Sequence, residues 1–309
     1  MNFFEKLQAL DRRWIYLLVA LAITIPLVVV FDSKTYTTTP TENIYQLIDS
    51  YAGRDDRAIM IDFMHDASTM SELFPMEVAI LRHAFQRKVK VFTICFLETA
   101  APLVDYAINT VKEEFPDIQS GVDYINIGYK PGALYLPIVL GMGDDISEAV
   151  KTDAEGRQLA NLPMMEKIKN YNEMNLVIET SGSGFGASWF VYARPRFGVN
   201  VAAGITAVMA ADAYPYIQTG QLVGILAGLK GAAEYEKLVD LFAIHDKPFS
   251  REIARTTHVS ITDDTVPYKF KAARIGMNAQ TVVHILIILF IVIGNIGYFI
   301  ERRRNKELN

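Results

Sequence analysis

Two long apolar segments lie near the ends of the chain, at residues 14–31 and 281–300, and neither contains Asp, Glu, Lys or Arg. A helix rises about 1.5 Å per residue, so segments of this length can cross a hydrocarbon core of about 30 Å. We therefore expect both to be transmembrane helices. A cleaved signal peptide is the alternative for the first, but residues 28–32 (VVVFD) offer no small-residue cleavage site.

Basic residues outnumber acidic ones at both ends of the chain, by three to two in residues 1–13 and by four to two in residues 301–309. The rest of the chain is acidic, since the whole carries 30 basic and 35 acidic residues. The positive-inside rule then predicts a two-pass protein of the cell membrane, with both termini cytoplasmic and the middle extracytoplasmic. The expected order is a cytoplasmic N-terminus (1–13), a transmembrane helix (14–31), a spacer (32–41), an extracytoplasmic α/β domain (42–257), a juxtamembrane segment (258–280), a transmembrane helix (281–300) and a basic cytoplasmic tail (301–309).

Short apolar runs alternate with amphipathic helical patterns in the middle of the chain. The runs predict strands that are buried on both faces, at residues 58–64, 89–96, 122–128, 175–180 and 200–205. Helical patterns follow them, the last of which is a long one at residues 221–241. This alternation predicts an α/β fold, a three-layer Rossmann-like or flavodoxin-like domain with a mainly parallel five-stranded sheet. The pattern does not fix the strand order.

Ligands of such sheets bind beyond the carboxyl ends of the strands. The candidate ligand-binding residues at those ends are Asp62, Lys130, Thr180, Gly182, Ser183, Gly184, Gly186 and Thr206. The glycines give a G-x-G-x-G spacing between a strand and a helix, so free backbone N–H groups there can bind an anion. The run is neither the dinucleotide fingerprint nor a P-loop, because the spacing differs and no Gly-Lys-Ser/Thr follows. A tight turn without a ligand is the alternative.

The sequence gives less support to a metal site, a reactive cysteine or nucleic-acid binding. Asp62, His65 and Asp66 are possible metal ligands, but Asp66 is equally suited to cap the following helix, so we predict neither a metal nor a cofactor. Cys95 is the one cysteine, so an intramolecular disulfide is excluded. It lies in an apolar run predicted as a strand, where we expect its thiol to be inert. The net charge of −5 gives no support to nucleic-acid binding.

Glycines at four-residue spacing, Gly220, Gly224 and Gly228, fall on one face of the long helix predicted at residues 221–241. A glycine face allows close helix packing, against the protein's own sheet, a second protomer or a membrane-protein partner. The overall hypothesis is a membrane-anchored extracytoplasmic α/β binding or assembly protein within a membrane complex, in contact with the lipid bilayer. The alternative is an anchored, hydrolase-like enzyme that uses the glycine-rich loop to bind an anion.

Overall fold

The computed structural model describes residues 11–182, 188–263 and 265–307 of the 309-residue chain. The chain divides into two compact units. The larger unit comprises residues 34–259 and 264–274 and holds the sheet; the smaller comprises residues 1–33, 260–263 and 275–309 and holds two apolar helices.

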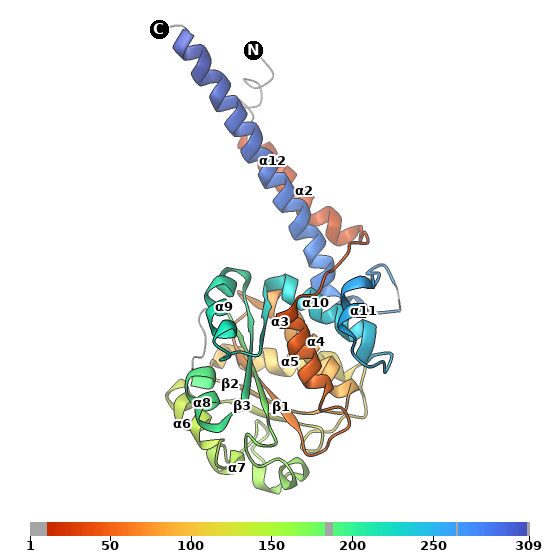
Figure 1. Ribbon diagram of the computed structural model, residues 1–309, viewed down its shortest axis with the longest axis vertical. Coiled ribbons are helices and arrows are strands. Elements are labelled where there is room, and N and C mark those ends of the chain that lie inside the picture. The colour runs from red at the N-terminus through yellow and green to blue at the C-terminus, as the bar shows by residue number, and fades with distance from the viewer. Residues whose placement is uncertain (1–10, 183–187, 264, 308–309) are drawn as a thin grey trace. The chain divides into compact units, whose positions relative to one another are not determined.

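The larger unit is an α/β domain built on six strands, all parallel, in the order β3-β2-β1-β4-β5-β6 (Figure 1). This is the strand order of doubly wound α/β folds. The strands are β1 (Ala58–Met64), β2 (Lys90–Cys95), β3 (Tyr124–Tyr129), β4 (Leu176–Ser181), β5 (Asn200–Ile205) and β6 (Gly224–Ala227). The helices are α3 (Thr39–Asp49), α4 (Met70–Gln86), α5 (Ala101–Lys112), α6 (Tyr135–Gly141), α7 (Ile146–Ala149), α8 (Arg194–Phe197), α9 (Ala210–Gln218), α10 (Gly228–Leu238) and α11 (Arg251–Thr256).

Helices cover both faces of the sheet, which explains why its strands are apolar throughout. On one face α4 packs between α5 and α10 (Figure 1). On the other face a buried cluster joins alternate strand residues such as Met60 and Val177 to Ile138 of α6 and to a π-helical turn, Trp189–Ala193. Because successive strand residues point to opposite faces, each strand supplies both cores.

The five predicted strands are confirmed: β1 and β5 have the predicted bounds, and β2, β3 and β4 begin and end within two residues of theirs. The sheet has a sixth strand, β6, that the pattern did not reveal. Its residues fall within the segment predicted as the long helix 221–241, of which only α10 and a π-helical turn, Val239–Ala243, are helical.

The prediction of a glycine-lined helix face is therefore wrong. Gly220 lies in the turn before β6 with φ +73°, Gly224 begins β6, and Gly228 begins α10 with φ +58°. Gly224 is required for close approach, since a Cβ there would lie 2.2 Å from the carbonyl oxygen of Pro40 in α3. These glycines serve a turn, a strand crossing and a helix start, and they share no helical stripe.

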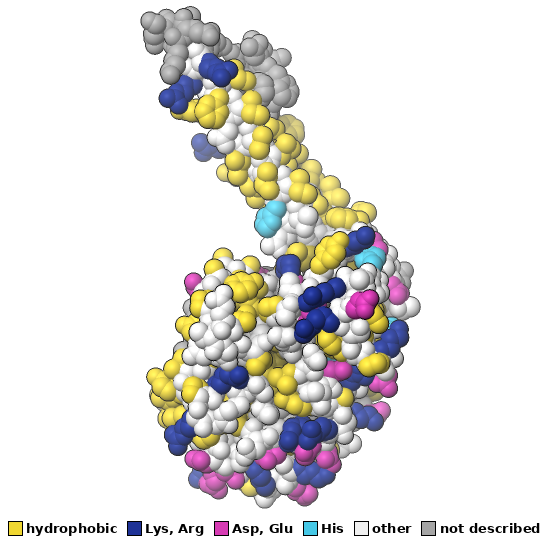
Figure 2. All heavy atoms as spheres, viewed as in Figure 1, with side chains coloured by type: hydrophobic (Ala, Val, Ile, Leu, Met, Phe, Trp, Pro, Cys, Tyr) yellow, Lys and Arg dark blue, Asp and Glu magenta, His cyan; other side chains and the backbone are white. Residues whose placement is uncertain are grey.

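The smaller unit contains α2 (Arg12–Val28) and most of α12 (Ala272–Glu307). Among the described residues, one helical segment, Ala272–Ile300 of α12, is long and apolar enough to cross a membrane, and only 6% of its apolar window is buried. Hydrophobic side chains cover this helix in Figure 2. Helix α2 has 17 residues and ends three residues before the predicted end of the first span, so at about 26 Å it falls short of a full hydrocarbon core.

Buried charges anchor the first turn of α12 within the larger unit. Glu236 of α10 accepts hydrogen bonds from the backbone N–H groups of Ala273 (2.9 Å) and Arg274 (3.0 Å), and burial raises the pKa of Glu236 to about 8. Asp240 pairs with both Arg274 and Arg82 of α4. All five residues are buried, so the charged groups among them have lost their hydration water and are stabilised by pairing with one another.

Candidate functional site

The strand order reverses between β1 and β4, and this reversal defines the candidate site. The chain runs from β1 outward through β2 to β3, and from β4 outward through β5 to β6. The loops that follow β1 and β4 therefore leave the sheet in opposite directions, and in open α/β sheets ligands bind at the carboxyl edge beside such a switch point. We call this place the switch-point crevice.

Two carboxylates lie side by side beneath the crevice, on the face of the sheet that packs against α6. Asp62 of β1 and Glu179 of β4 are register partners, with 0% and 2% exposure. The indole N–H of Trp189 donates to Asp62 Oδ2 at 2.8 Å, and the rings of Tyr135 and Tyr171 pack around the indole. Asp62 Oδ1 is buried and has no hydrogen-bond partner among the described residues.

The electrostatics of this group follow from burial. Loss of hydration raises the pKa of Asp62 to about 7, against the lowering effect of the Trp189 hydrogen bond. Burial, then the charges of Glu179 and Asp62, raise the pKa of Tyr135. Burial thus favours the neutral form of the Asp62 carboxyl group.

A second polar group lies on the opposite face of the sheet, against α4. Thr180 Oγ1 donates to Glu77 Oε1 at 2.6 Å, and His65 Nε2 lies 2.8 Å from the same oxygen. His65 Nδ1 donates to the carbonyl oxygen of Asp66 at 3.0 Å. Burial lowers the pKa of His65, but its hydrogen bond and charge attraction to Glu77 outweigh this and raise the pKa overall. Both ring nitrogens of His65 are therefore occupied.

Gly182 brings the two crevice loops together. Its N–H donates to the carbonyl oxygen of Met64 at the end of β1, at 3.4 Å. A Cβ at position 182 would lie 2.5 Å from Thr69 Oγ1, so the loop after β4 approaches the loop after β1 only because this residue is glycine. The other predicted residues of this loop, Ser183, Gly184 and Gly186, lie outside the described residues.

The remaining predicted residues lie on other strands. Thr206, at the end of β5, is buried, and its hydroxyl has no partner in the described part of the chain. Lys130 follows β3, two strands from β1, and its ammonium donates to the carbonyl oxygen of Thr152 at 3.1 Å. The structure thus places Asp62, Thr180 and Gly182 on or directly after the neighbouring strands β1 and β4, with the Asp62 and Thr180 side chains on opposite faces of the sheet, whereas Lys130 is engaged elsewhere.

The possible metal ligands do not converge. Asp62 binds Trp189 on one face, while His65 binds Glu77 on the other. Asp66 Oδ1 accepts from the backbone N–H of Ser68 at 2.8 Å, which closes a turn ahead of α4; the N-cap of α4 is Thr69, so Asp66 does not cap the helix. Over residues 11–182, 188–263 and 265–307, no three His, Cys, Asp or Glu side chains are placed to hold a metal ion.

Sequence reasoning missed Glu179, Glu77 and Trp189. Glu179 lies inside the run NLVIET and Glu77 inside the helical run FPMEVAILRHAF. A charged residue within an otherwise apolar, buried element is a usable signal, because such a group is retained only with partners. Trp189 carried no comparable signal, since a lone Trp is ordinary in a core.

Comparison with known protein families, with curated proteins and with solved structures finds no match to this chain.

Proposed function

We propose that this chain is a membrane-anchored binding protein, part of a membrane complex, whose extracytoplasmic α/β domain takes a ligand in the switch-point crevice. One observation carries the proposal: Asp62 Oδ1 is buried without a partner in the described part, directly beneath the reversal of strand order. A buried oxygen without a hydrogen bond is costly, and a ligand that donates to it would remove that cost.

The polar groups buried at the crevice indicate the chemistry of the proposed ligand. Asp62 and the hydroxyl of Thr206 offer acceptor oxygens, and Glu179 adds a second carboxylate beside Asp62. These groups favour a ligand rich in N–H or O–H donors, such as an amine or a polyol. An anion beside two carboxylates is disfavoured by charge repulsion. Anion binding at this place would therefore depend on residues 183–187, which are not among the residues that the structure describes.

Two membrane spans are part of the same proposal. The apolar window of α12 supports the second span. The first rests on the uncharged segment 14–31 and on α2, whose residues Trp14, Tyr16 and Val28 are 59%, 68% and 76% exposed. Asn278 of α12 donates to the carbonyl oxygen of Phe31 (2.6 Å), just beyond α2. Reporter fusions at residues 117 and 309 are expected to report opposite sides of the membrane, and identical readings would refute this topology.

An anchored enzyme is the second candidate, and the raised pKa of Asp62 is the observation that favours it. A carboxyl group that titrates near neutral pH suits a general acid or base. However, His65 has both nitrogens occupied, and burial raises the pKa of Cys95 to about 12. Neither residue is thus prepared for nucleophilic catalysis, so binding is the better-supported function.

Tryptophan emission offers a direct test, since the chain has only two tryptophans. Trp14→Phe leaves Trp189, which is hydrogen bonded to Asp62, as the single reporter. The full chain in detergent is titrated with putrescine, glucose or inorganic phosphate. Saturable changes with putrescine or glucose are expected, weakened about tenfold by Asp62→Asn because a charge-assisted hydrogen bond is lost.

The matched control is Asp144→Asn, which changes an exposed aspartate elsewhere and is expected to titrate like the parent. A response to phosphate alone would contradict the acceptor argument. The absence of any saturable response, or an Asp62→Asn protein that titrates like its parent, would refute the binding site.

A further inference from the structure

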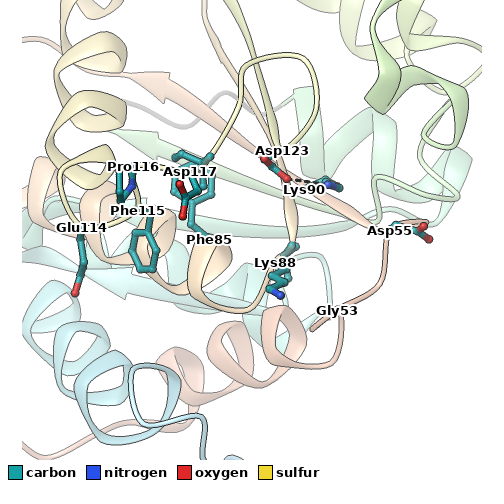
Figure 3. Close-up of a pocket in the computed structure, with 12 residues that line it drawn as sticks. Gly53, Asp55, Phe85, Lys88, Lys90, Glu114, Phe115, Pro116, Asp117 and Asp123 are labelled. Atoms are coloured by element: carbon teal, nitrogen blue, oxygen red, sulfur yellow. Dashed lines mark hydrogen bonds and ion pairs between the residues drawn. The ribbon is translucent and has the colours of Figure 1, made fainter.

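A separate cavity lies at the amino edge of the sheet, at the opposite ends of the strands from the switch-point crevice. It has a volume of about 460 Å³, within the range of small-molecule sites. The end of α4, the start of β2 and the segment before β3 supply most of its lining (Figure 3). None of these residues belongs to the proposed binding function.

Most charged side chains around the cavity already have partners. Lys90 pairs with Asp123 at 3.0 Å. Glu114 accepts a hydrogen bond from Arg82 at 2.8 Å, and Asp55 pairs with Lys167. These ion pairs neutralise Asp55, Glu114 and Asp123, so these three carboxylates contribute little net charge to the cavity.

Two lining charges remain, one of each sign. The side chains of Lys88 and Asp117 form no ion pair or hydrogen bond within the described residues. Both are exposed to solvent, and Figure 3 shows Lys88 beyond the end of α4 and Asp117 on the segment before β3. The lining of the cavity therefore includes one cation and one anion without a partner among the described residues.

The backbone at Lys88 is unusual and fixes where its side chain begins. Lys88 has φ +54°, a left-handed conformation in which Gly or Asn is normally found. It ends α4 in a Schellman motif, with hydrogen bonds from Lys88 N–H to the Phe85 carbonyl (3.1 Å) and from Val89 N–H to the Ala84 carbonyl (2.8 Å). Glycine would adopt this backbone conformation at lower cost than lysine, but only lysine places a positive charge at the edge of the cavity.

The rest of the lining is apolar and partly aromatic. Phe85 and Phe115 meet edge to face with ring centroids 6.5 Å apart, and Val89, Pro116 and Ile118 complete the apolar lining. An aromatic or large aliphatic group would bury apolar area against these side chains.

We propose that this cavity binds a zwitterionic small molecule of the α-amino acid class with an aromatic or large apolar side chain. Lys88 pairs with the ligand carboxylate, Asp117 pairs with its ammonium group, and the side chain packs on Phe85 and Phe115. A ligand that lacks either charge leaves one of the two side chains without its partner, and this requirement for both charges gives the site its selectivity.

Calorimetric titration of the full chain in detergent tests each element of the proposal with a matched set of probes. L-Phenylalanine carries both charges and the ring, phenylacetate lacks the ammonium group, phenethylamine lacks the carboxylate, and L-alanine lacks the ring. L-Phenylalanine is expected to bind at least about tenfold more tightly than each of the other three.

Two variants assign the charges. Lys88→Asn removes the cation while keeping a residue that tolerates positive φ, and it should weaken L-phenylalanine about tenfold without changing phenethylamine. Asp117→Asn should weaken L-phenylalanine similarly without changing phenylacetate. Lys151→Asn, at an exposed lysine outside the cavity, is the control and should bind like the parent.

The outcomes also separate this site from the switch-point crevice. Asp62→Asn is expected to leave L-phenylalanine binding unchanged, and Lys88→Asn is expected to leave the Trp189 response to putrescine unchanged. Absence of L-phenylalanine binding, equal binding of all four probes, or insensitivity to both Lys88→Asn and Asp117→Asn would overturn the proposal. Loss of L-phenylalanine binding in Asp62→Asn would also overturn the proposal, because it would show that the ligand binds at the carboxyl edge of the sheet.

Discussion

Replacing Asp62 by asparagine should change how the stability of the domain depends on pH. In the folded protein the pKa of Asp62 is about 7 because of burial, against its usual value of 3.8. Between about pH 4 and pH 7 the folded state therefore holds a proton that the unfolded chain releases, so the free energy of unfolding falls as pH rises. The asparagine side chain would be neutral at every pH and would keep an acceptor for the Trp189 N–H, so the variant lacks this slope.

The size of the effect follows from the shift. The pKa rises by about three units, and each unit corresponds to about 1.4 kcal/mol, so ionising Asp62 costs the folded state about 4 kcal/mol above pH 7. The stability of Asp62→Asn relative to wild type should rise by about 1.4 kcal/mol per pH unit across the window and then level off. Titrating groups that do not contact Asp62, such as His65 and Glu236, contribute equally to both proteins and cancel in the difference.

Urea unfolding of the full chain in detergent, followed by Trp189 emission in a Trp14→Phe background, measures this difference at successive pH values. Asp144→Asn, which removes an exposed carboxylate, should show a nearly flat difference. A flat difference for Asp62→Asn as well would mean that Asp62 is ionised throughout the window in the folded state. That result would refute the reasoning from burial.

Three other outcomes test the fold. Gly224→Ala should cost about 2 kcal/mol on urea unfolding, because its Cβ would meet the Pro40 carbonyl, whereas Gly132→Ala, with a nearest contact of 3.9 Å, should be neutral. Asp240→Asn should cost about 3–5 kcal/mol by leaving two buried arginines underpaired, and a loss under about 1 kcal/mol would contradict the network. Cys95 should react with a thiol reagent only after unfolding; labelling of the folded protein would contradict its burial.

Local patterns in the sequence were sufficient for most of the α/β domain. The strands β1 to β5 were predicted because a strand buried on both faces must be apolar at nearly every position, and a run of four to eight such residues is visible without knowledge of its neighbours. Helical patterns between the strands were visible in the same way, although local pattern did not give the start of α4 at Met70. The carboxyl-edge rule then directed attention to Asp62, Thr180 and Gly182 before any strand order was known.

Strand β6 could not be predicted from the local pattern of apolar and polar residues. Residues 220–228 combine apolar residues with glycines at four-residue spacing, which fits a helix as well as a strand. The strand forms because β5 offers an unpaired edge, where Ala202 pairs with Gly224, and because α3 passes so close that only glycine fits. Both causes come from residues distant in sequence, and no short window contains them.

The candidate site depended on tertiary structure for the same reason. Asp62 and Trp189 are 127 positions apart, and Glu77 and Thr180 are 103 apart, yet each pair is hydrogen bonded. The sequence by itself determined the strands β1 to β5 and the residues near their ends, but not β6. Only the tertiary structure decided that β1 and β4 are neighbours. Hydrogen bonds between strands and the burial of Asp62 arise from that adjacency, and adjacency is a property of the folded chain rather than of any segment.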